Sequence, residues 1–208
     1  MYTHSKEFRD ALTPDLALKL LKEGNERFVK NLVANRNLLQ QVNATAEGQY
    51  PFATILSCMD SRTSAELIFD QGLGDIFSIR VAGNIVNEDI LGSMEYATKV
   101  VGTKLILVLG HTNCGAITGA CNGVEMGHLT PLLDKIKPAI RRETATTANR
   151  TGENQVFVNN VTKLNVQTSI GQIRRQSAII RQLEDEGKLR ITGGLYDVAS
   201  GRVMFFDN

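Results

Sequence analysis

The sequence predicts an α/β fold, in which a mostly parallel β-sheet is flanked by helices. Three short apolar runs are typical of buried parallel strands, at residues 52–57, 75–81 and 104–110. Helical patterns separate these runs, and strands that alternate with helices form parallel sheets through right-handed crossovers. Two later runs, 190–198 and 202–206, flank Ala199-Ser200-Gly201 and predict a hairpin. We therefore expect a central sheet of about four parallel strands plus an antiparallel edge strand.

The 208 residues are enough for one well-buried core, so we expect a single domain over 1–208. Residues 1–50 are expected to form an N-terminal helical arm, and 51–208 an α/β core. Within the arm, Thr13-Pro14 predicts a helix start, and leucines at helical spacing continue the pattern to Asn31. The polar stretch 35–50 is expected to wrap over a surface. Its amides and lack of charge suit a partner subunit as well as solvent, and we expect the arm helices to pack on such a partner.

Four further segments of the core have helical patterns, and one is expected to be a loop. The predicted helices cover residues 64–69, 88–101, 129–142 and 156–186. The threonine-rich segment 145–153 between the last two is predicted to be a loop. The strand at 202–206 lies at the sheet edge in this scheme, where it is available to pair with another subunit.

Composition excludes several classes of protein. The net charge of +1 gives no electrostatic argument for binding nucleic acid or a membrane surface. Apolar stretches fall short of the roughly 20 residues that span a bilayer, and residues 1–10 lack the apolar centre of a secretory signal. Three widely spaced cysteines argue against a disulfide framework. We expect a cytoplasmic protein.

Two cysteines and a histidine follow predicted strands and suggest a metal site. Cys58 follows the strand at 52–57, and His111 and Cys114 follow the strand at 104–110. Because parallel α/β sheets bind ligands beyond the carboxyl ends of their strands, these side chains are expected to meet. Thiolates and imidazole are zinc ligands, and three of them with one open position are typical of a catalytic zinc.

The same loop supplies a carboxylate and a guanidinium. Asp60 is close enough to Cys58 to accept a hydrogen bond from water on the metal, or to ligate the metal itself. Arg62 follows, and its planar fork can hold a carboxylate bidentately. Held in that way, Asp60 stays ionised and turned away from the metal.

Two other classes of protein are alternatives to a catalytic zinc enzyme. A fourth protein ligand, for which Asp60, Cys121 and His128 are the candidates, would make the metal structural and the chain a non-catalytic interaction protein. A cysteine phosphatase is disfavoured, because only three residues separate Cys58 from Arg62 and one of them is an aspartate that repels phosphate. Cys121 is interpreted as a small buried apolar residue.

Three motifs together resemble those of the β-class carbonic anhydrases: Cys58-Met59-Asp60-Ser61-Arg62, Arg80-Val81-Ala82-Gly83-Asn84 and Gly110-His111-Thr112-Asn113-Cys114-Gly115. The resemblance spans most of the chain. It implies an enzyme with one Zn²⁺ per subunit that interconverts carbon dioxide and bicarbonate by attack of zinc-bound hydroxide. It also implies a homodimer or a dimer of dimers. A carbon disulfide hydrolase on the same fold is the alternative within this resemblance.

The resemblance also implies roles for individual residues. By position, Cys58, His111 and Cys114 match the zinc ligands, and Asp60 and Arg62 match the catalytic dyad, with Asp60 a possible fourth ligand in an inactive state. The residues that match substrate contacts are Gln49, which usually acts across the dimer interface, and Phe77, Ala82, Tyr96 and Gly115.

Two positions depart from the pattern that the resemblance implies. Val81 stands where many members carry asparagine, so the support of the dyad is open. Ile55 stands where bicarbonate-regulated members carry tryptophan, so we expect that the non-catalytic bicarbonate pocket is missing. The form with water on zinc is therefore expected near neutral pH.

Overall fold

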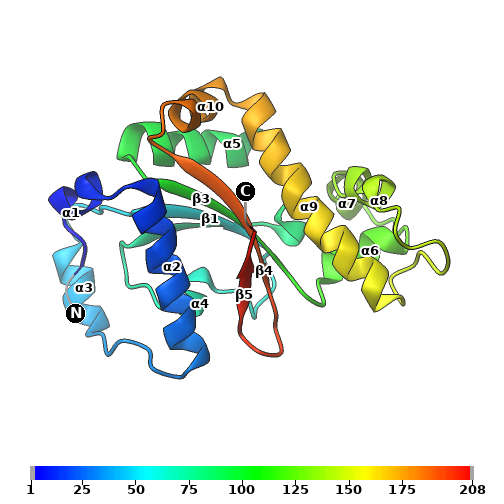
Figure 1. Ribbon diagram of the computed structural model, residues 1–208, viewed down its shortest axis with the longest axis horizontal. Helices are drawn as coiled ribbons and strands as arrows, with labels where there is room; N and C mark the ends of the chain where they lie inside the picture. The colour runs from blue at the N-terminus through cyan, green and yellow to red at the C-terminus, as the bar shows by residue number, and fades with distance from the viewer. Residues whose placement is uncertain (1–2, 207–208) are drawn as a thin grey trace.

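The chain forms a five-stranded sheet between two layers of helices, in a computed structural model that describes residues 3–206 (Figure 1). The strand order is β2-β1-β3-β4-β5, with β1 to β4 parallel and β5 antiparallel to β4. This arrangement confirms the predicted sheet. The strands are β1 (Ala53–Ser57), β2 (Ile76–Arg80), β3 (Leu105–His111), β4 (Arg190–Tyr196) and β5 (Val203–Phe205).

Helices cover both faces of the sheet and one of its ends (Figure 1). Helices α2 and α4 lie on one face, α5, α9 and α10 lie on the other, and α6, α7 and α8 gather with one half of α9. The helices are α1 (Lys6–Ala11), α2 (Pro14–Val29), α3 (Leu38–Ala44), α4 (Ala65–Ile68), α5 (Glu88–Glu95), α6 (Gly115–Cys121), α7 (Leu129–Asp134), α8 (Lys137–Arg142), α9 (Gln155–Gln176) and α10 (Ala178–Asp185), with a 3-10 turn at Ala82–Asn84 and a π-helical turn at Tyr96–Val101.

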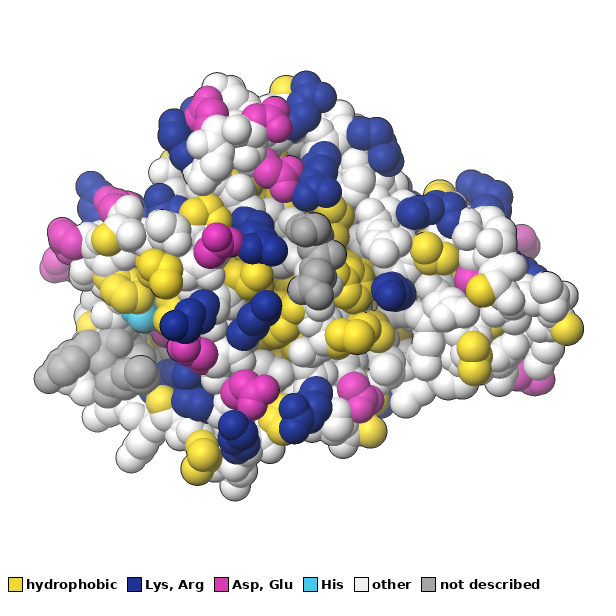
Figure 2. All heavy atoms as spheres, viewed as in Figure 1, with side chains coloured by type: hydrophobic (Ala, Val, Ile, Leu, Met, Phe, Trp, Pro, Cys, Tyr) yellow, Lys and Arg dark blue, Asp and Glu magenta, His cyan; other side chains and the backbone are white. Residues whose placement is uncertain are grey.

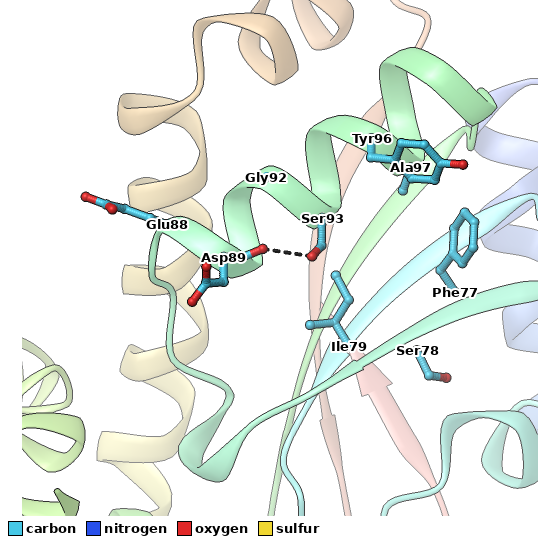
Figure 3. A pocket seen from close by; sticks show the side chains of 9 residues that line it. All are labelled: Phe77, Ser78, Ile79, Glu88, Asp89, Gly92, Ser93, Tyr96 and Ala97. Carbon is cyan, nitrogen blue, oxygen red and sulfur yellow. Dashed lines mark hydrogen bonds between the residues drawn. The ribbon is translucent and has the colours of Figure 1, made fainter.

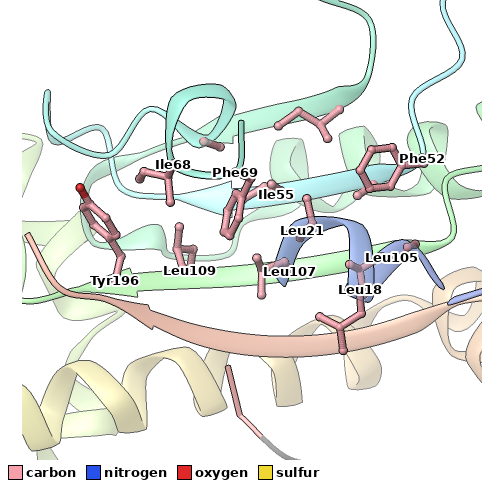
Figure 4. Close-up of a cluster of buried hydrophobic side chains, with 14 residues drawn as sticks. Leu18, Leu21, Phe52, Ile55, Ile68, Phe69, Leu105, Leu107, Leu109 and Tyr196 are labelled. Atoms are coloured by element: carbon pink, nitrogen blue, oxygen red, sulfur yellow. The ribbon is translucent and has the colours of Figure 1, made fainter. Parts of the chain in front are cut away.

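Strand β3 lies at the centre of the sheet and supplies buried side chains to the core on both faces of the sheet. Alternate side chains of a strand point to opposite sides. Leu105, Leu107 and Leu109 pack against α2 and α4 (Figure 4). Ile106 and Val108 pack against α9 and α5 on the other side. Burial on both faces explains why this strand has the continuous apolar run that the sequence shows.

Helix α2 begins as the sequence predicts, but it packs on its own subunit. The Thr13 hydroxyl accepts a hydrogen bond from the Leu16 N–H (3.2 Å), and proline follows at the first helical position. Leu18 and Leu21 are buried in the same cluster as β1 and β3 (Figure 4). This part of the arm therefore belongs to the core of its own chain, and packing of the arm on a partner subunit stays a prediction.

Three segments differ from the elements that the sequence predicts. The stretch 35–50 contains the short helix α3, which Asn37 caps by accepting from the Gln40 N–H (3.0 Å). The pattern at 156–186 divides into α9 and α10 at Ser177, whose backbone is extended and whose hydroxyl accepts from the Ile180 N–H (3.1 Å). The pattern at 129–142 divides into α7 and α8, where a proline begins the second helix. Side-chain caps therefore begin α3 and α10, at Asn37 and Ser177.

The strand register brings the predicted metal ligands together. Ser57 pairs with Leu109, so that the next residue, Cys58, lies near the end of β3, where His111 is the last residue. On the face shown in Figure 2, lysine and arginine side chains lie interspersed with aspartate and glutamate side chains. Within residues 3–206, no helix has the length and apolar character needed to cross a bilayer.

Candidate metal centre

Cys58, His111 and Cys114 form one buried cluster at the carboxyl ends of β1 and β3. Their ligand atoms all lie within 4.8 Å of one another. The two sulfur atoms are 3.9 Å apart. Two thiolates that each lie about 2.3 Å from a tetrahedral zinc are about 3.8 Å apart, so this spacing suits a shared zinc.

The histidine is oriented as a ligand. The Nδ1 atom of His111 lies 2.9 Å from the carbonyl oxygen of Thr112, which can only accept, so Nδ1 carries the proton. The Nε2 atom is then an acceptor, and it is buried without a hydrogen-bond partner. An unpaired buried nitrogen is costly unless a ligand uses its lone pair. The donor set of two thiols and this nitrogen therefore fits zinc.

The surroundings of the two thiols favour ionisation of Cys58 and not of Cys114. The pKa of Cys58 is lowered to about 4, chiefly because the Cys114 thiol donates a hydrogen bond to its sulfur. The pKa of Cys114 is raised in turn by that bond and by burial. The Gly83 N–H also donates to the Cys58 sulfur (3.4 Å). Gly83 has a φ of +67°, and a Cβ atom there would lie 2.9 Å from Ile136, so only glycine fits this approach.

Asp60 and Arg62 form the bidentate pair that the sequence predicts. The Nε and Nη2 atoms of Arg62 donate to the two carboxylate oxygens at 2.9 and 2.8 Å, and the Arg62 backbone N–H adds a third bond at 3.0 Å. The hydrogen bond from the Arg62 side chain is the largest cause that lowers the pKa of Asp60. The carboxylate is therefore ionised, and its remaining lone pairs are free to accept.

Two residues outside the predicted set hold the loop that carries Cys58 and Asp60. Arg80 donates to the carbonyl oxygens of Cys58 (3.2 Å) and Asp60 (2.5 Å). The Thr63 hydroxyl lies 2.9 Å from each of the same two carbonyls. Arg80 stood in one of the three motifs, but its contacts depend on the pairing of β1 with β2, which the motif does not show.

A small cavity opens beside the cluster and contains two of the predicted substrate contacts. Its volume is about 300 Å³, and both apolar and polar residues line it. Ala82 and Gly115 lie here together with Cys58 and Asp60. The lining residues are Cys58, Met59, Asp60, Ala82, Gly115, Ala116, Gly119, Leu129 and Leu133.

The other three predicted substrate contacts lie elsewhere in the subunit. Phe77 and Tyr96 line a separate pocket of about 670 Å³ between β2 and α5 (Figure 3), and Tyr96 is 55% exposed. Gln49 is exposed and precedes β1, whereas the metal ligands follow the carboxyl ends of β1 and β3. One chain therefore does not bring these three residues into the cavity beside Cys58.

The candidates for a fourth ligand do not join the cluster. Among the described residues, the group of potential ligands contains Cys58, His111 and Cys114 only. His128 is exposed, and Asp60 is held by Arg62. Cys121 is half-buried and not buried as predicted, and burial raises its pKa to about 11. Ile55 is fully buried among apolar side chains.

Comparison with known proteins agrees with this geometry. The family model described as "Carbonic anhydrase" matches residues 53–203. The chain is 35% identical over 201 residues to Carbonic anhydrase 2 of Mycobacterium tuberculosis, with 94% of each protein covered. A β-carbonic anhydrase of Aspergillus fumigatus has a similar structure (TM-score 0.73, 25% identity, 93% of this chain and 90% of that chain). So does a tetrameric β-carbonic anhydrase of Sordaria macrospora (TM-score 0.70, 27% identity, 78% and 84%). The chain belongs to the β-class carbonic anhydrases.

Proposed function

We propose that the protein hydrates carbon dioxide reversibly to bicarbonate and a proton, with one zinc ion per subunit held by Cys58, His111 and Cys114. The observation that carries this proposal is the three-ligand cluster with an ionised Asp60 beside it at a small cavity. When bound, zinc supplies an electrophile that acidifies water and makes it nucleophilic at neutral pH.

The residues around the cluster orient the reactants. Asp60 accepts a hydrogen bond from the reacting water, so an O–H of that water points to the carboxylate and a lone pair is left to attack the substrate. The second carboxylate oxygen stays engaged with Arg62. Ala82 and Leu133 give the cavity apolar walls that suit carbon dioxide. The backbone N–H of Gly115 is the proposed donor to a substrate oxygen.

We also propose that the functional unit is a homodimer or a dimer of dimers in which Gln49, Phe77 and Tyr96 complete the site of the partner subunit. Two findings support this. The three residues lie outside the Cys58 cavity of their own chain. Tyr96 is exposed and lines a separate pocket with Phe77 (Figure 3). The solved relative from Sordaria macrospora is described as tetrameric. The cytoplasmic location expected from the sequence stays a prediction.

Stopped-flow hydration of carbon dioxide tests the activity. The purified protein should lose the activity when a chelator removes zinc and regain it when zinc is restored, and Cys58→Ser should be inactive under both conditions. A metal with four protein ligands and no hydration activity would instead favour a structural zinc. Parallel assays with carbon disulfide would identify the alternative hydrolase, if that substrate alone were consumed.

Mixing two inactive variants tests the shared site. Cys58→Ser removes a metal ligand, and Gln49→Ala removes the proposed substrate contact from the neighbouring site. A mixed dimer should contain one site with both residues intact, so remixed subunits should regain activity that neither variant shows alone. Failure of the mixture to recover activity, when mixed dimers are shown to form, would contradict the shared site.

A further inference from the structure

Thr112 follows the proposed metal ligand His111. The β4–β5 hairpin holds Thr112 through its backbone N–H and its hydroxyl. Its backbone N–H donates to the carbonyl oxygen of Tyr196 (2.9 Å). Its hydroxyl lies 3.1 Å from the Oδ1 atom of Asp197 and accepts from the Val198 N–H at 3.1 Å. Because a carboxylate can only accept, the hydroxyl proton points to Asp197. The orientation of Thr112 is therefore set by a hairpin about 85 residues further along the chain.

The remaining polar group of Thr112 contacts the ligand. Its carbonyl oxygen lies 2.9 Å from Nδ1 of His111. This bond fixes both the tautomer and the rotation of the ring, and it leaves Nε2 as the buried nitrogen without a partner. In metalloproteins, the partner of the non-ligating nitrogen commonly tunes the affinity of the metal.

Asp197 is itself held in one orientation. Its Oδ1 atom accepts from the Ala199 N–H (3.2 Å), and its Oδ2 atom accepts from the Ser200 hydroxyl (2.6 Å). The hairpin turn is tied to α2 as well, because the buried Asn25 donates to the Gly201 carbonyl at 2.9 Å and accepts from the Val203 N–H at 2.9 Å. The carboxylate is thus a fixed acceptor for Thr112.

We propose that Thr112 and Asp197 are positioning residues that set the His111 imidazole toward the metal. Thr112 contacts the ring through its carbonyl oxygen, and Asp197 acts through the Thr112 hydroxyl. The inference rests on the metal site of the proposed function and adds two residues to it.

The test compares Thr112→Val, which keeps the shape of the side chain but lacks the hydroxyl, with Thr112→Ser, which keeps the hydroxyl. Zinc affinity is measured by competition with a chelator, and the visible spectrum is recorded with Co²⁺ in place of zinc. Thr112→Val should weaken zinc binding by about 10- to 100-fold and shift the Co²⁺ bands. Thr112→Ser should bind and absorb as the wild type does. Unchanged affinity and spectrum in a folded Thr112→Val would overturn the proposal.

A second test uses Asp197→Ala with Ser200→Ala as its control. It decides the positioning role if Thr112→Val does not fold. Asp197→Ala removes the acceptor for Thr112, whereas Ser200→Ala removes a bond to the other carboxylate oxygen. Only the first should weaken zinc binding, and equal effects of the two variants would overturn the proposal. The double variant Thr112→Val/Asp197→Ala should bind zinc no more weakly than either single variant, because Asp197 acts on the ligand only through Thr112.

Failure of this inference is distinguishable from failure of the proposed function. A wild type that binds no zinc would overturn both. A wild type that binds zinc but does not hydrate carbon dioxide would contradict the proposed activity, and the affinities of the variants would still decide the roles of Thr112 and Asp197.

Discussion

Two aspartates of this protein are each held by arginine, and the two pairs differ in burial and in sequence separation. Arg62 lies two positions after Asp60, and the Arg62 side chain is 49% exposed. The Asp70 side chain is 1% exposed and binds Arg27 and Arg36, which lie 43 and 34 residues away. The first pair borders the candidate metal centre. The second joins α2 and the segment after it to the loop after α4.

The same kind of ion pair borders the candidate metal centre in one place and attaches the arm to the core in the other. An exposed pair contributes little to stability, so Asp60 can exchange partners at low cost. A buried carboxylate without its arginines would be strongly destabilising. Asp70 also accepts from the Ala34 N–H (3.2 Å), and its own carbonyl accepts from Arg36 (2.5 Å). These contacts hold the arm against the core.

Asp60→Asn should show the largest effect, and the effect should be confined to activity. The amide accepts hydrogen bonds poorly where the carboxylate is needed, so hydration should fall by about 10²- to 10³-fold. Zinc content and the free energy of unfolding should stay close to wild type. The control is Asp134→Asn, which alters an exposed carboxylate of α7 and should leave the rate unchanged. A full-rate Asp60→Asn would remove Asp60 from the mechanism.

Asp70→Asn should have the opposite pattern, with stability lost and zinc retained. Asparagine tolerates the left-handed backbone of Asp70 (φ +47°), so the variant removes the charge without adding strain. The free energy of unfolding should fall by about 3 kcal/mol, as when a buried pair is broken. Urea unfolding measures the change. Asp15→Asn, which alters a pair with an 81% exposed aspartate, is the control and should change it by less than about 0.5 kcal/mol.

Acid should reduce the difference between wild type and Asp70→Asn. Burial alone would raise the pKa of Asp70, but the hydrogen bonds from Arg27 and Arg36 outweigh it and hold the pKa below its usual range. A lowered pKa stabilises the fold above the unfolded value of about 3.9, and this contribution is lost as the pH falls through the folded pKa. Urea unfolding at a series of pH values should show the two proteins converging below about pH 4. A constant difference would exclude ionisation as the source of the effect.

Arg62→Ala should have the smallest effect and tests whether the exposed pair is a switch. Without its bidentate partner, Asp60 is free to turn and ligate the metal. Activity should fall by about 10-fold at neutral pH, with stability nearly unchanged because the pair is exposed. The Co²⁺ spectrum should report a change of ligand. Arg62→Lys is the matched variant, because it retains the charge and loses the fork. An unaltered Co²⁺ spectrum in Arg62→Ala would contradict the switch.

The sheet and the metal cluster were predictable because their signals are local. The apolar run of β3 has burial on both faces, and Cys58 and His111 stand next to strand ends that parallel pairing must bring together. The Asp60–Arg62 pair needs only two residues of separation. Such features depend on side-chain type and spacing, which a sequence displays directly.

Several features that the sequence does not reveal depend on contacts between distant segments. The bonds of Arg80 to the Cys58 loop require the pairing of β1 with β2. The break at Ser177 depends on a cap whose hydroxyl also donates to Glu95 (2.6 Å), which lies on α5. The pairing of Asp70 with Arg27 and Arg36 could not be predicted from spacing, because both arginines lie in the arm, far from Asp70 in the sequence.

The sequence by itself determined the succession of the main strands and helices along the chain, the three candidate metal ligands and the local carboxylate–arginine pair. The tertiary structure decided which of the implied substrate contacts share a cavity with the ligands. Ala82 and Gly115 do, because they lie near the strand ends that carry Cys58 and His111. Gln49 and Phe77 do not, because they lie at the amino ends of β1 and β2, whereas the cluster lies at the carboxyl ends of β1 and β3. Tyr96 does not, because it follows α5 and lines a separate pocket with Phe77.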